Sequence, residues 1–471
     1  MTIDGILTFI GILFAAWAII PKIKKLQLSI NTNKFISLSI ILSVCAILYL
    51  QYYTFFESIG WALHIGIEYK WGISPNKMSF LVLFIPIGCA LYLINNNSYS
   101  KKNILKIKNY IIETRKENDT GLACKLIEDN LEHIVESSEN HENEYKPPAD
   151  FILYDFLQER DALSYLVKYN YMLAILIQSY FKRFSFNFSE SFHVEALSNK
   201  ESFLYKEVFS KYQSSMYYIF NDDSYLNFIL TNVDVANKLG VYKPIGDFLI
   251  DHLDDIYQKE ESKRYDRQLR SDDVNKLKDS EIYIVIAFFD LLIKNSIRQG
   301  YNDHMWLLYY GYFSERIIRN IGEPILIPKN SSEWQSTYHF FIEEMINNII
   351  NWIKLCESSS DFNKLDCTEE VNIEKFSIDT LCAILKQVIH EHNEKIDSKM
   401  KVCFTESVFE LVIFLRTKNS RYSKYLENAL LNDIYGKKDT RSIEFYSTAI
   451  DDFDLPKYEY KDWEYLKKLI S

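Results

Sequence analysis

The sequence predicts an all-α protein with three N-terminal transmembrane helices followed by a large helical cytoplasmic domain. Three observations favour this fold class. The first hundred residues contain long uncharged stretches, apolar residues elsewhere repeat at helical spacing, and only 13 of 471 residues are glycine. Because β-sandwiches and doubly wound α/β folds use glycine for turns and phosphate loops, the scarcity of glycine disfavours both.

Charge divides the chain near residue 100. The first hundred residues carry six basic and three acidic residues, which leaves 47 basic and 61 acidic residues in the remainder. Hydrophobic residues make up 48% of the whole chain and aromatic residues 15%, so intrinsic disorder is excluded. Seven scattered cysteines do not form the framework of a secreted disulfide-rich protein.

Three uncharged stretches predict the transmembrane helices. They are residues 5–20, 35–56 and 78–94, and about 20 apolar residues cross a hydrocarbon core of about 30 Å. The second ends in aromatic residues expected at a membrane interface, and the third contains Pro86, which neighbouring helices can tolerate in a membrane. The first stretch lacks the basic start of a signal peptide, so we expect it to remain as an anchor.

Basic side chains follow the first and third predicted spans, where we expect them to contact lipid headgroups. They are Lys22, Lys24, Lys25, Lys101, Lys102, Lys106 and Lys108. Because loops on the cytoplasmic side are enriched in basic residues, both segments are predicted to be cytoplasmic. We therefore expect an integral inner (plasma) membrane protein with its N-terminus outside and its large C-terminal domain in the cytoplasm. If only two stretches span the membrane, that domain changes side.

The segment between the second and third spans, residues 57–77, is more apolar than a solvated loop. Trp61 and Trp71 favour an interfacial helix in the headgroup layer. The alternative is a re-entrant element in which Glu57, His64 and Glu68 line a path for ions. The spans carry no charged residue, so any pore would have to be oligomeric.

The rest of the chain is predicted to contain a stalk, a linker and a domain. Residues 99–137 are predicted to form a juxtamembrane helical stalk. The polar residues 138–150, which include two prolines, are predicted to form a linker. Residues 151–471 form the helical cytoplasmic domain, in which we expect roughly ten to twelve helices.

Apolar residues at helical spacing support that domain most clearly in three segments. These segments are residues 245–257, 340–352 and 378–389. In the first of them the apolar face comprises Ile245, Phe248, Leu249, Leu253 and Ile256, and aspartates occupy the other face.

Catalytic and metal-binding signatures are sparse. The sequence has no GxxxxGKS/T, GxGxxG, GxSxG, HExxH or paired CxxC motif, which disfavours the large enzyme families but leaves an unfamiliar enzyme open. His390, His392 and Glu394 are metal-ligand types, but residues two apart face opposite sides of a helix, so core or flanking histidines are favoured. The irregularly spaced cysteines 356, 367, 382 and 403 are expected to be buried apolar residues. We therefore predict no catalytic residue, no metal site and no cofactor.

One basic stretch stands out in the acidic domain. Between residues 416 and 441, seven basic residues oppose three acidic ones. The candidate anion-binding or nucleic-acid-binding residues are Arg416, Lys418, Arg421, Tyr422, Lys424, Lys437, Lys438 and Arg441. Pairing with the acidic remainder of the chain, or contact with anionic lipid, is the favoured interpretation, and recognition of a nucleotide or nucleic acid is the alternative.

Short spans joined to a large inner domain indicate recognition inside the cell. In this arrangement the chain resembles the membrane-anchored effectors of bacterial anti-phage and abortive-infection systems, although no residue motif carries the resemblance. The resemblance implies antiviral defence, in which the helical domain senses an intracellular trigger or partner and the spans disrupt the membrane. The alternatives are a scaffold that holds a partner protein at the inner leaflet, and an enzyme or nucleic-acid-binding protein that uses residues 416–441. Expected partners are membrane lipids and either another protein or further copies of this chain.

Overall fold

The fold is all-α throughout the part of the chain that the computed structural model describes. The described residues are 11, 15, 18–32, 34–62, 74–95, 103–139, 148–180, 185–213, 224–259, 274–301, 306–322, 336–358, 373–390, 395–433, 435–453 and 460–470. Within these ranges there is no strand, and one isolated bridge joins Asn432 to Lys438. The chain divides into two compact units, residues 1–165 and 166–471. The predicted all-α fold class is therefore confirmed for these residues.

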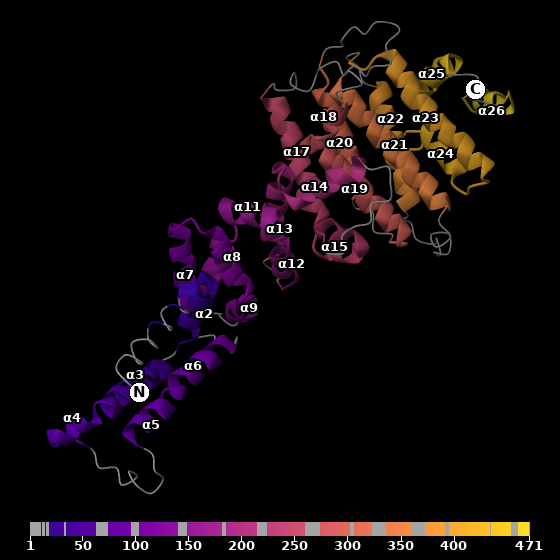
Figure 1. Cartoon of the computed structure of the whole chain (residues 1–471). Coiled ribbons are helices and arrows are strands. Elements are labelled where there is room, and N and C mark those ends of the chain that lie inside the picture. The colour runs from indigo at the N-terminus through magenta and orange to yellow at the C-terminus, as the bar shows by residue number, and fades with distance from the viewer. Residues whose placement is uncertain are drawn as a thin grey trace. The chain divides into compact units, whose positions relative to one another are not determined.

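The first unit begins with apolar helices. They are α2 (Lys22–Asn31), α3 (Lys34–Gln51), α4 (Tyr53–Ser58), α5 (Pro75–Val82) and α6 (Phe84–Asn95). Helix α3 packs against both α5 and α6, and Figure 1 shows the three alongside one another. No single helix among the described residues is both long and apolar enough to cross a membrane. Residues 22–31 and 35–51 satisfy the requirement together, but they bend by 99° at the break between them.

The third predicted span is broken into two helices. Helix α5 ends at Val82, and α6 begins two residues later. Pro86 explains this break, because proline has no N–H to donate to the carbonyl of Val82, four residues earlier. The prediction of three transmembrane helices remains a prediction, and most of the first stretch lies outside the described residues.

A small helical cluster completes the first unit. Its elements are α7 (Ile104–Lys116), α8 (Thr120–Glu128), α9 (Leu131–Glu139), α10 (Pro148–Asp150) and the π-helix η2 (Phe151–Phe156). Helix α7 contacts α8, α9 and α10 and buries Ile104, Ile107 and Ile111. The segment predicted to be a stalk therefore folds onto itself as a packed cluster.

The second unit is an array of helices around a buried centre. Following α11 (Arg160–Tyr169), which crosses the division between the units, its elements are α12 (Tyr171–Tyr180), α13 (Ser185–Ser198), α14 (Phe203–Gln213), α15 (Tyr225–Thr231), α16 (Val233–Lys238), α17 (Tyr242–Gln258), α18 (Val274–Lys278), α19 (Glu281–Arg298), α20 (Leu307–Asn320), α21 (Thr337–Ser358), α22 (Ile373–His390), α23 (Ser398–Thr417), α24 (Ser423–Leu431), α25 (Thr440–Ala449), η6 (Ile450–Asp452) and α26 (Tyr460–Ile470). The expected ten to twelve helices were too few even for the described residues, because several helices are short and carry little periodicity.

Helix α19 forms the centre of the second unit. Ser280 caps its first turn by accepting a hydrogen bond from the backbone N–H of Tyr283 at 3.2 Å. Every residue from Ile282 to Ile293 is buried, as expected for a helix that is apolar nearly all round. Helices α14, α17 and α21 pack against it (Figure 1).

The three segments with clear helical spacing lie on α17, α21 and α22. In α17 the side chains of Ile245, Leu249, Leu253 and Ile256 are buried, as predicted, and Asp251 is exposed. The predicted stripes on α21 and α22 are also buried. Phe248, the remaining residue of the first predicted stripe, is half-buried, and the other residues of the three stripes confirm the prediction. Helices α20, α21 and α22 all contact one another.

Helices α17 and α20 approach closely at a glycine. A Cβ atom added at Gly246 would lie 2.1 Å from a ring carbon of Tyr309. The Tyr309 hydroxyl donates a hydrogen bond to Asp247 Oδ1 at 2.9 Å, which fixes the ring over the glycine. The close approach therefore depends on the absence of a side chain at residue 246.

Candidate functional site

The predicted basic stretch forms two groups rather than one continuous patch. The nine-residue helix α24 lies between them and is about 13 Å long at 1.5 Å per residue. The first group lies where α23 leads into α24 and comprises Arg416, Lys418, Arg421, Tyr422 and Lys424. The second lies where α24 leads into α25 and comprises Lys437, Lys438 and Arg441. All seven basic side chains are exposed, and Tyr422 is partly buried.

The arginines of the first group stack on aromatic rings of the same unit. The guanidinium carbon of Arg416 lies 3.4 Å from the ring centroid of Tyr465, and that of Arg421 lies 4.8 Å from the centroid of Tyr422. The Tyr465 hydroxyl in turn donates to Glu427 Oε1 at 2.5 Å. These contacts join α26 to α23 and α24, so Arg416 has a structural role.

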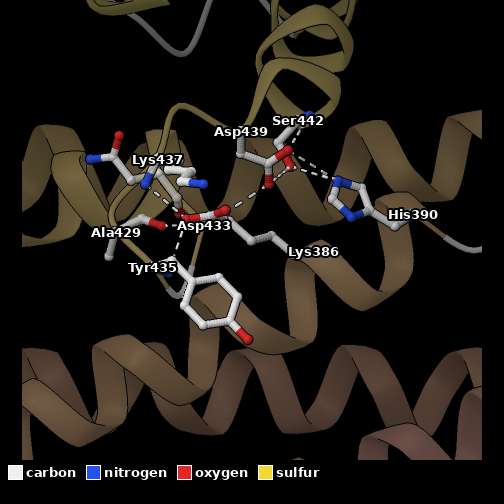
Figure 2. Close-up of polar contacts among 9 residues, drawn as sticks. Lys386, His390, Ala429, Asp433, Tyr435, Lys437, Asp439 and Ser442 are labelled. Carbon is white, nitrogen blue, oxygen red and sulfur yellow. Dashed lines mark hydrogen bonds and ion pairs between the residues drawn. The ribbon is translucent and has the colours of Figure 1, made fainter.

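The second group is carried by a short, closely hydrogen-bonded segment, residues 432, 433 and 435–439, which we call the basic turn. Asp433 Oδ1 accepts hydrogen bonds from the backbone N–H groups of Tyr435, at 2.9 Å, and Lys437, at 2.8 Å. The Asp433 N–H donates to the Lys437 carbonyl at 2.7 Å, and the Gly436 N–H donates to the Asp433 carbonyl at 3.0 Å. Gly436 has a φ of 73°, which favours glycine. Figure 2 shows this side chain of Asp433 at the centre of the turn.

A lysine from α22 holds the basic turn against the rest of the unit. Lys386 Nζ donates to the carbonyl of Ala429 at 2.8 Å and to the carbonyl of Asn432 (Figure 2). The same nitrogen lies 3.9 Å from Asp439 Oδ2. Because these carbonyls lie at the end of α24, the lysine satisfies acceptors that have no partner within the helix.

A serine, a histidine and an aspartate meet at the start of α25, but their order differs from that of a nucleophilic triad. Ser442 Oγ donates to Asp439 Oδ2 at 2.8 Å, and His390 Nε2 lies 3.0 Å from Ser442 Oγ and 3.5 Å from Asp439 Oδ1 (Figure 2). In a hydrolase the histidine stands between the other two and uses a different nitrogen for each. Ser442 is fully buried. This geometry fits a helix cap rather than catalysis.

The charge of Asp439 is stabilised by this cap. Burial by itself would raise the pKa of Asp439, but hydrogen bonds from Ser442 and the nearby charges of His390 and Lys386 outweigh burial and lower the pKa. Its Oδ1 also accepts from the Ser442 N–H at 3.1 Å, the usual N-cap contact. The carboxylate is therefore engaged inside the unit, and it does not neutralise the exposed lysines of the basic turn.

Lysines near the predicted spans also have partners within the first unit. Lys22 Nζ lies 2.5 Å from Glu117 Oε2. Lys106 Nζ donates to the carbonyls of Ile30 and Thr32, both at 3.1 Å, at the end of α2. Lys108 lies 4.7 Å from the centroid of the Phe151 ring. Helix α2 also carries Lys24 and Lys25, whereas Lys101 and Lys102 lie outside the described residues. Contact of these lysines with lipid headgroups remains a prediction.

The predicted membrane-loop residues are only partly described. Trp61 is exposed, and its carbonyl accepts a hydrogen bond from the Tyr49 hydroxyl at 3.4 Å. His64, Glu68 and Trp71 lie outside the described residues. Neither the interfacial helix nor the re-entrant element is tested.

Metal-ligand residues do not cluster within the described ranges, where no group of three His, Cys, Asp or Glu side chains could hold an ion. His390 takes part in the helix cap, and His392 and Glu394 lie outside these ranges. Cys356 and Cys382 are buried as expected, and burial raises the pKa of Cys382 to about 12. The prediction was wrong for Cys403, which is exposed on α23 because it faces away from the core stripe of that helix.

Sequence reasoning missed the residues that shape the basic turn. Lys386 lies more than 40 residues from the carbonyls that it binds, so no local pattern indicates its role. Asp433 and Gly436 could have been found, because an aspartate followed shortly by glycine is a typical turn signal.

Comparison with known proteins finds no matching family model, no similar curated protein and no similar solved structure.

Proposed function

We propose that this protein attaches to a membrane through α3, α5 and α6 and acts as a sensor or effector whose second unit recognises an intracellular trigger or partner. The observation that carries the proposal is the exposure of large apolar side chains on these helices. They are Phe35, Leu38, Ile41, Leu42, Val44, Leu48, Phe80, Leu81, Phe84, Ile85 and Tyr92.

So many exposed apolar side chains need an apolar surrounding that shields them from water. Soluble monomers rarely expose contiguous apolar patches larger than a few hundred Å². Here residues 35–56 contain no charged side chain, and Leu42 on α3 is 59% exposed. Hydrocarbon would cover such side chains without requiring another protein surface. Helices α3, α5 and α6 pair most of their backbone groups internally, as a bilayer demands, and α3 packs against the other two.

The output of the second unit would be a change at the membrane. That unit has its own core around α19, as a folded recognition module requires. In the effector model a trigger binds the second unit, copies of the chain assemble, and their apolar helices disrupt the bilayer in antiviral defence. In the scaffold model the same helices only hold a partner protein at the membrane.

Substitution of exposed apolar residues of α3 in the full chain tests the attachment to the membrane. Leu42→Asp, together with Ile41→Asp, places carboxylates on the exposed face of α3, and each costs about 3 kcal/mol in a bilayer centre. We expect the variant to be lost from the membrane fraction after alkaline extraction and from vesicles in flotation. Leu308→Asp on α20 of the second unit, where the leucine is 39% exposed, is the control and should remain attached. A wild-type chain that stays soluble in both assays would disprove the proposal.

Membrane potential separates effector from scaffold. If the protein is an effector, expression of the wild-type chain, with or without phage infection, should depolarise cells, and the double aspartate variant should not. Stable attachment without depolarisation in either condition would favour the scaffold.

A further inference from the structure

We propose that the basic turn, residues 432, 433 and 435–439, binds anionic lipid headgroups, so that the second unit makes a reversible contact with the bilayer. The inference rests on the proposed attachment of the first unit. The chemistry recognised is a layer of lipid phosphates beside an apolar interior.

Three side chains of the turn are presented to solvent. Tyr435 is 81% exposed, and Lys437 and Lys438 are exposed beside it. Among the described residues these three side chains have no hydrogen bond or ion pair. Arg416 of the first group differs, because its guanidinium is held in the fold by stacking on the Tyr465 ring. The turn therefore holds an aromatic ring and two cations that have no described partner in the fold.

The backbone beneath these side chains is already ordered. Asp433 fixes the turn through its hydrogen bonds to the N–H groups of Tyr435 and Lys437, and Lys386 fastens its start to α22 (Figure 2). A ligand would therefore pay little conformational entropy to order the turn. The carboxylates of Asp433 and Asp439 are directed into these contacts, so the exposed charge of the turn is positive.

The combination of residues matches an anionic membrane surface. Tyrosine is enriched at the headgroup level, where its ring is shielded and its hydroxyl stays hydrated. Lysines near the surface are attracted by the negative potential of anionic lipids. Lys437 and Lys438 lie two and three residues after Tyr435, so the three can meet one patch of headgroups.

Single-stranded nucleic acid is a poorer match. Such ligands need successive aromatic platforms for successive bases. The Tyr425 hydroxyl donates to Asp379 at 2.6 Å and Lys375 lies 5.6 Å from its ring centroid, while Arg421 covers Tyr422. Among these three tyrosines, Tyr435 is the one whose ring has no contact of this kind with a described residue. A single ring does not supply stacking platforms for the successive bases of a nucleic acid.

The expected strength fits a tethered contact. Each lysine near an anionic surface contributes about 1 kcal/mol, so Lys437 and Lys438 together contribute about 2 kcal/mol and raise the partition of the segment about thirtyfold. That factor is too small to recruit a free acidic domain of this size. It gives a weak, reversible contact in a unit that the first unit already holds near the bilayer, at an effective concentration of about 1 mM.

The test uses the full chain with a photo-crosslinking residue, Tyr435→p-benzoylphenylalanine. The protein is mixed with vesicles of phosphatidylcholine alone or of equal parts phosphatidylcholine and phosphatidylglycerol, floated, and then irradiated. We expect flotation with both vesicles and a lipid adduct at residue 435 only with the anionic vesicles. Lys437→Gln combined with Lys438→Gln should reduce the adduct by about an order of magnitude, and added salt should do the same.

The control is Tyr460→p-benzoylphenylalanine on α26. Tyr460 is 75% exposed but stands beside Asp462 and Glu464, so it should give no anion-dependent adduct. A circular dichroism spectrum equal to that of wild type shows that the lysine variant is folded.

The outcomes separate the two proposals. Flotation with both vesicles but no adduct at residue 435, or an equal adduct with both, overturns the inference and leaves the proposed attachment standing. Flotation only with anionic vesicles, abolished by the lysine substitutions, supports the inference and contradicts attachment through the apolar helices. An adduct with added single-stranded oligonucleotide that displaces the lipid adduct also overturns the inference.

Discussion

The buried carboxylate of Asp290 should be a main determinant of stability in the second unit. It lies on α19 with no exposed surface. Its Oδ2 is 2.7 Å from Lys294 Nζ, and its Oδ1 accepts a hydrogen bond from the Trp352 indole N–H at 2.8 Å. The carboxylate therefore joins α19 to α21 across 62 positions of sequence. We consider two substitutions, Asp290→Ala and Asp290→Asn.

The structure sets the size of each effect. In Asp290→Ala the buried indole N–H loses its acceptor, which costs about 1–3 kcal/mol. Loss of a buried ion pair costs about 3–5 kcal/mol when it leaves a buried charge, but Lys294 is partly exposed and can turn to water, so we expect a total of about 3 kcal/mol. In Asp290→Asn the amide oxygen still accepts from Trp352, and we expect a loss of about 1 kcal/mol.

Urea unfolding of the two variants and the wild type measures these free energies. Far-ultraviolet circular dichroism follows the helices, and tryptophan fluorescence follows Trp352 together with the other six tryptophans of the chain. Equal losses for Ala and Asn would refute the reasoning, because they would show that the indole hydrogen bond contributes nothing. A loss below about 1 kcal/mol for Asp290→Ala would also refute it.

Three further predictions concern stability and the basic turn. Gly246→Ala should cost about 1–3 kcal/mol in urea unfolding, because the new methyl group meets the ring of Tyr309. Burial lowers the pKa of His193 from 6.5 to about 4, although its hydrogen bond to a backbone carbonyl raises it, so the unfolded chain takes up a proton at a higher pH than the folded chain. Stability should therefore be full above pH 6.5 and fall by up to about 3 kcal/mol as the pH drops toward 4, and His193→Gln should flatten that dependence. Lys386→Met should loosen the turn and speed tryptic cleavage after Lys437 several-fold.

Each of these predictions has a result that contradicts it. Unchanged stability of Gly246→Ala would mean that α17 and α20 separate freely. An equally steep acid dependence in His193→Gln would assign the effect to other groups, of which His339, with a pKa lowered by burial to about 4, is the first candidate. Lys418→Met is the control variant for the trypsin experiment. If tryptic cleavage after Lys437 is as slow in Lys386→Met as in this control, the bonds from Lys386 on α22 do not order the turn.

The spacing of apolar residues in the sequence predicted which faces of individual helices are buried. The stripe from Phe340 to Trp352 and the stripe from Ile378 to Ile389 were placed on buried helix faces because burial follows the 3.6-residue period. The basic residues of 416–441 were identified as one stretch, but their division into two groups depends on where α24 begins and ends, and charge composition does not show that boundary.

Contacts between distant residues could not be predicted. The bond from Lys386 to Ala429 and the bond from Trp352 to Asp290 join residues more than 40 positions apart. Lysine and aspartate are ordinarily surface residues, so nothing in the sequence around Lys386 or Asp290 indicates these bonds. The break near Pro86 could not be predicted for a related reason. Proline interrupts a helix in water, whereas neighbouring helices can tolerate it within a membrane.

The contact between α2 and the cluster of α7 and α8 makes the N-terminal segment part of one folding unit. Ile30 is fully buried there, Gln27 donates to Asp129 at 2.6 Å, and Lys106 closes the end of α2. A chain starting after residue 100 would lose these partners and uncover apolar surface on α7. Helix α2 is therefore not a detachable tag, and processing or an alternative translation start that removed it would leave the cluster of α7 and α8 without its packing partner.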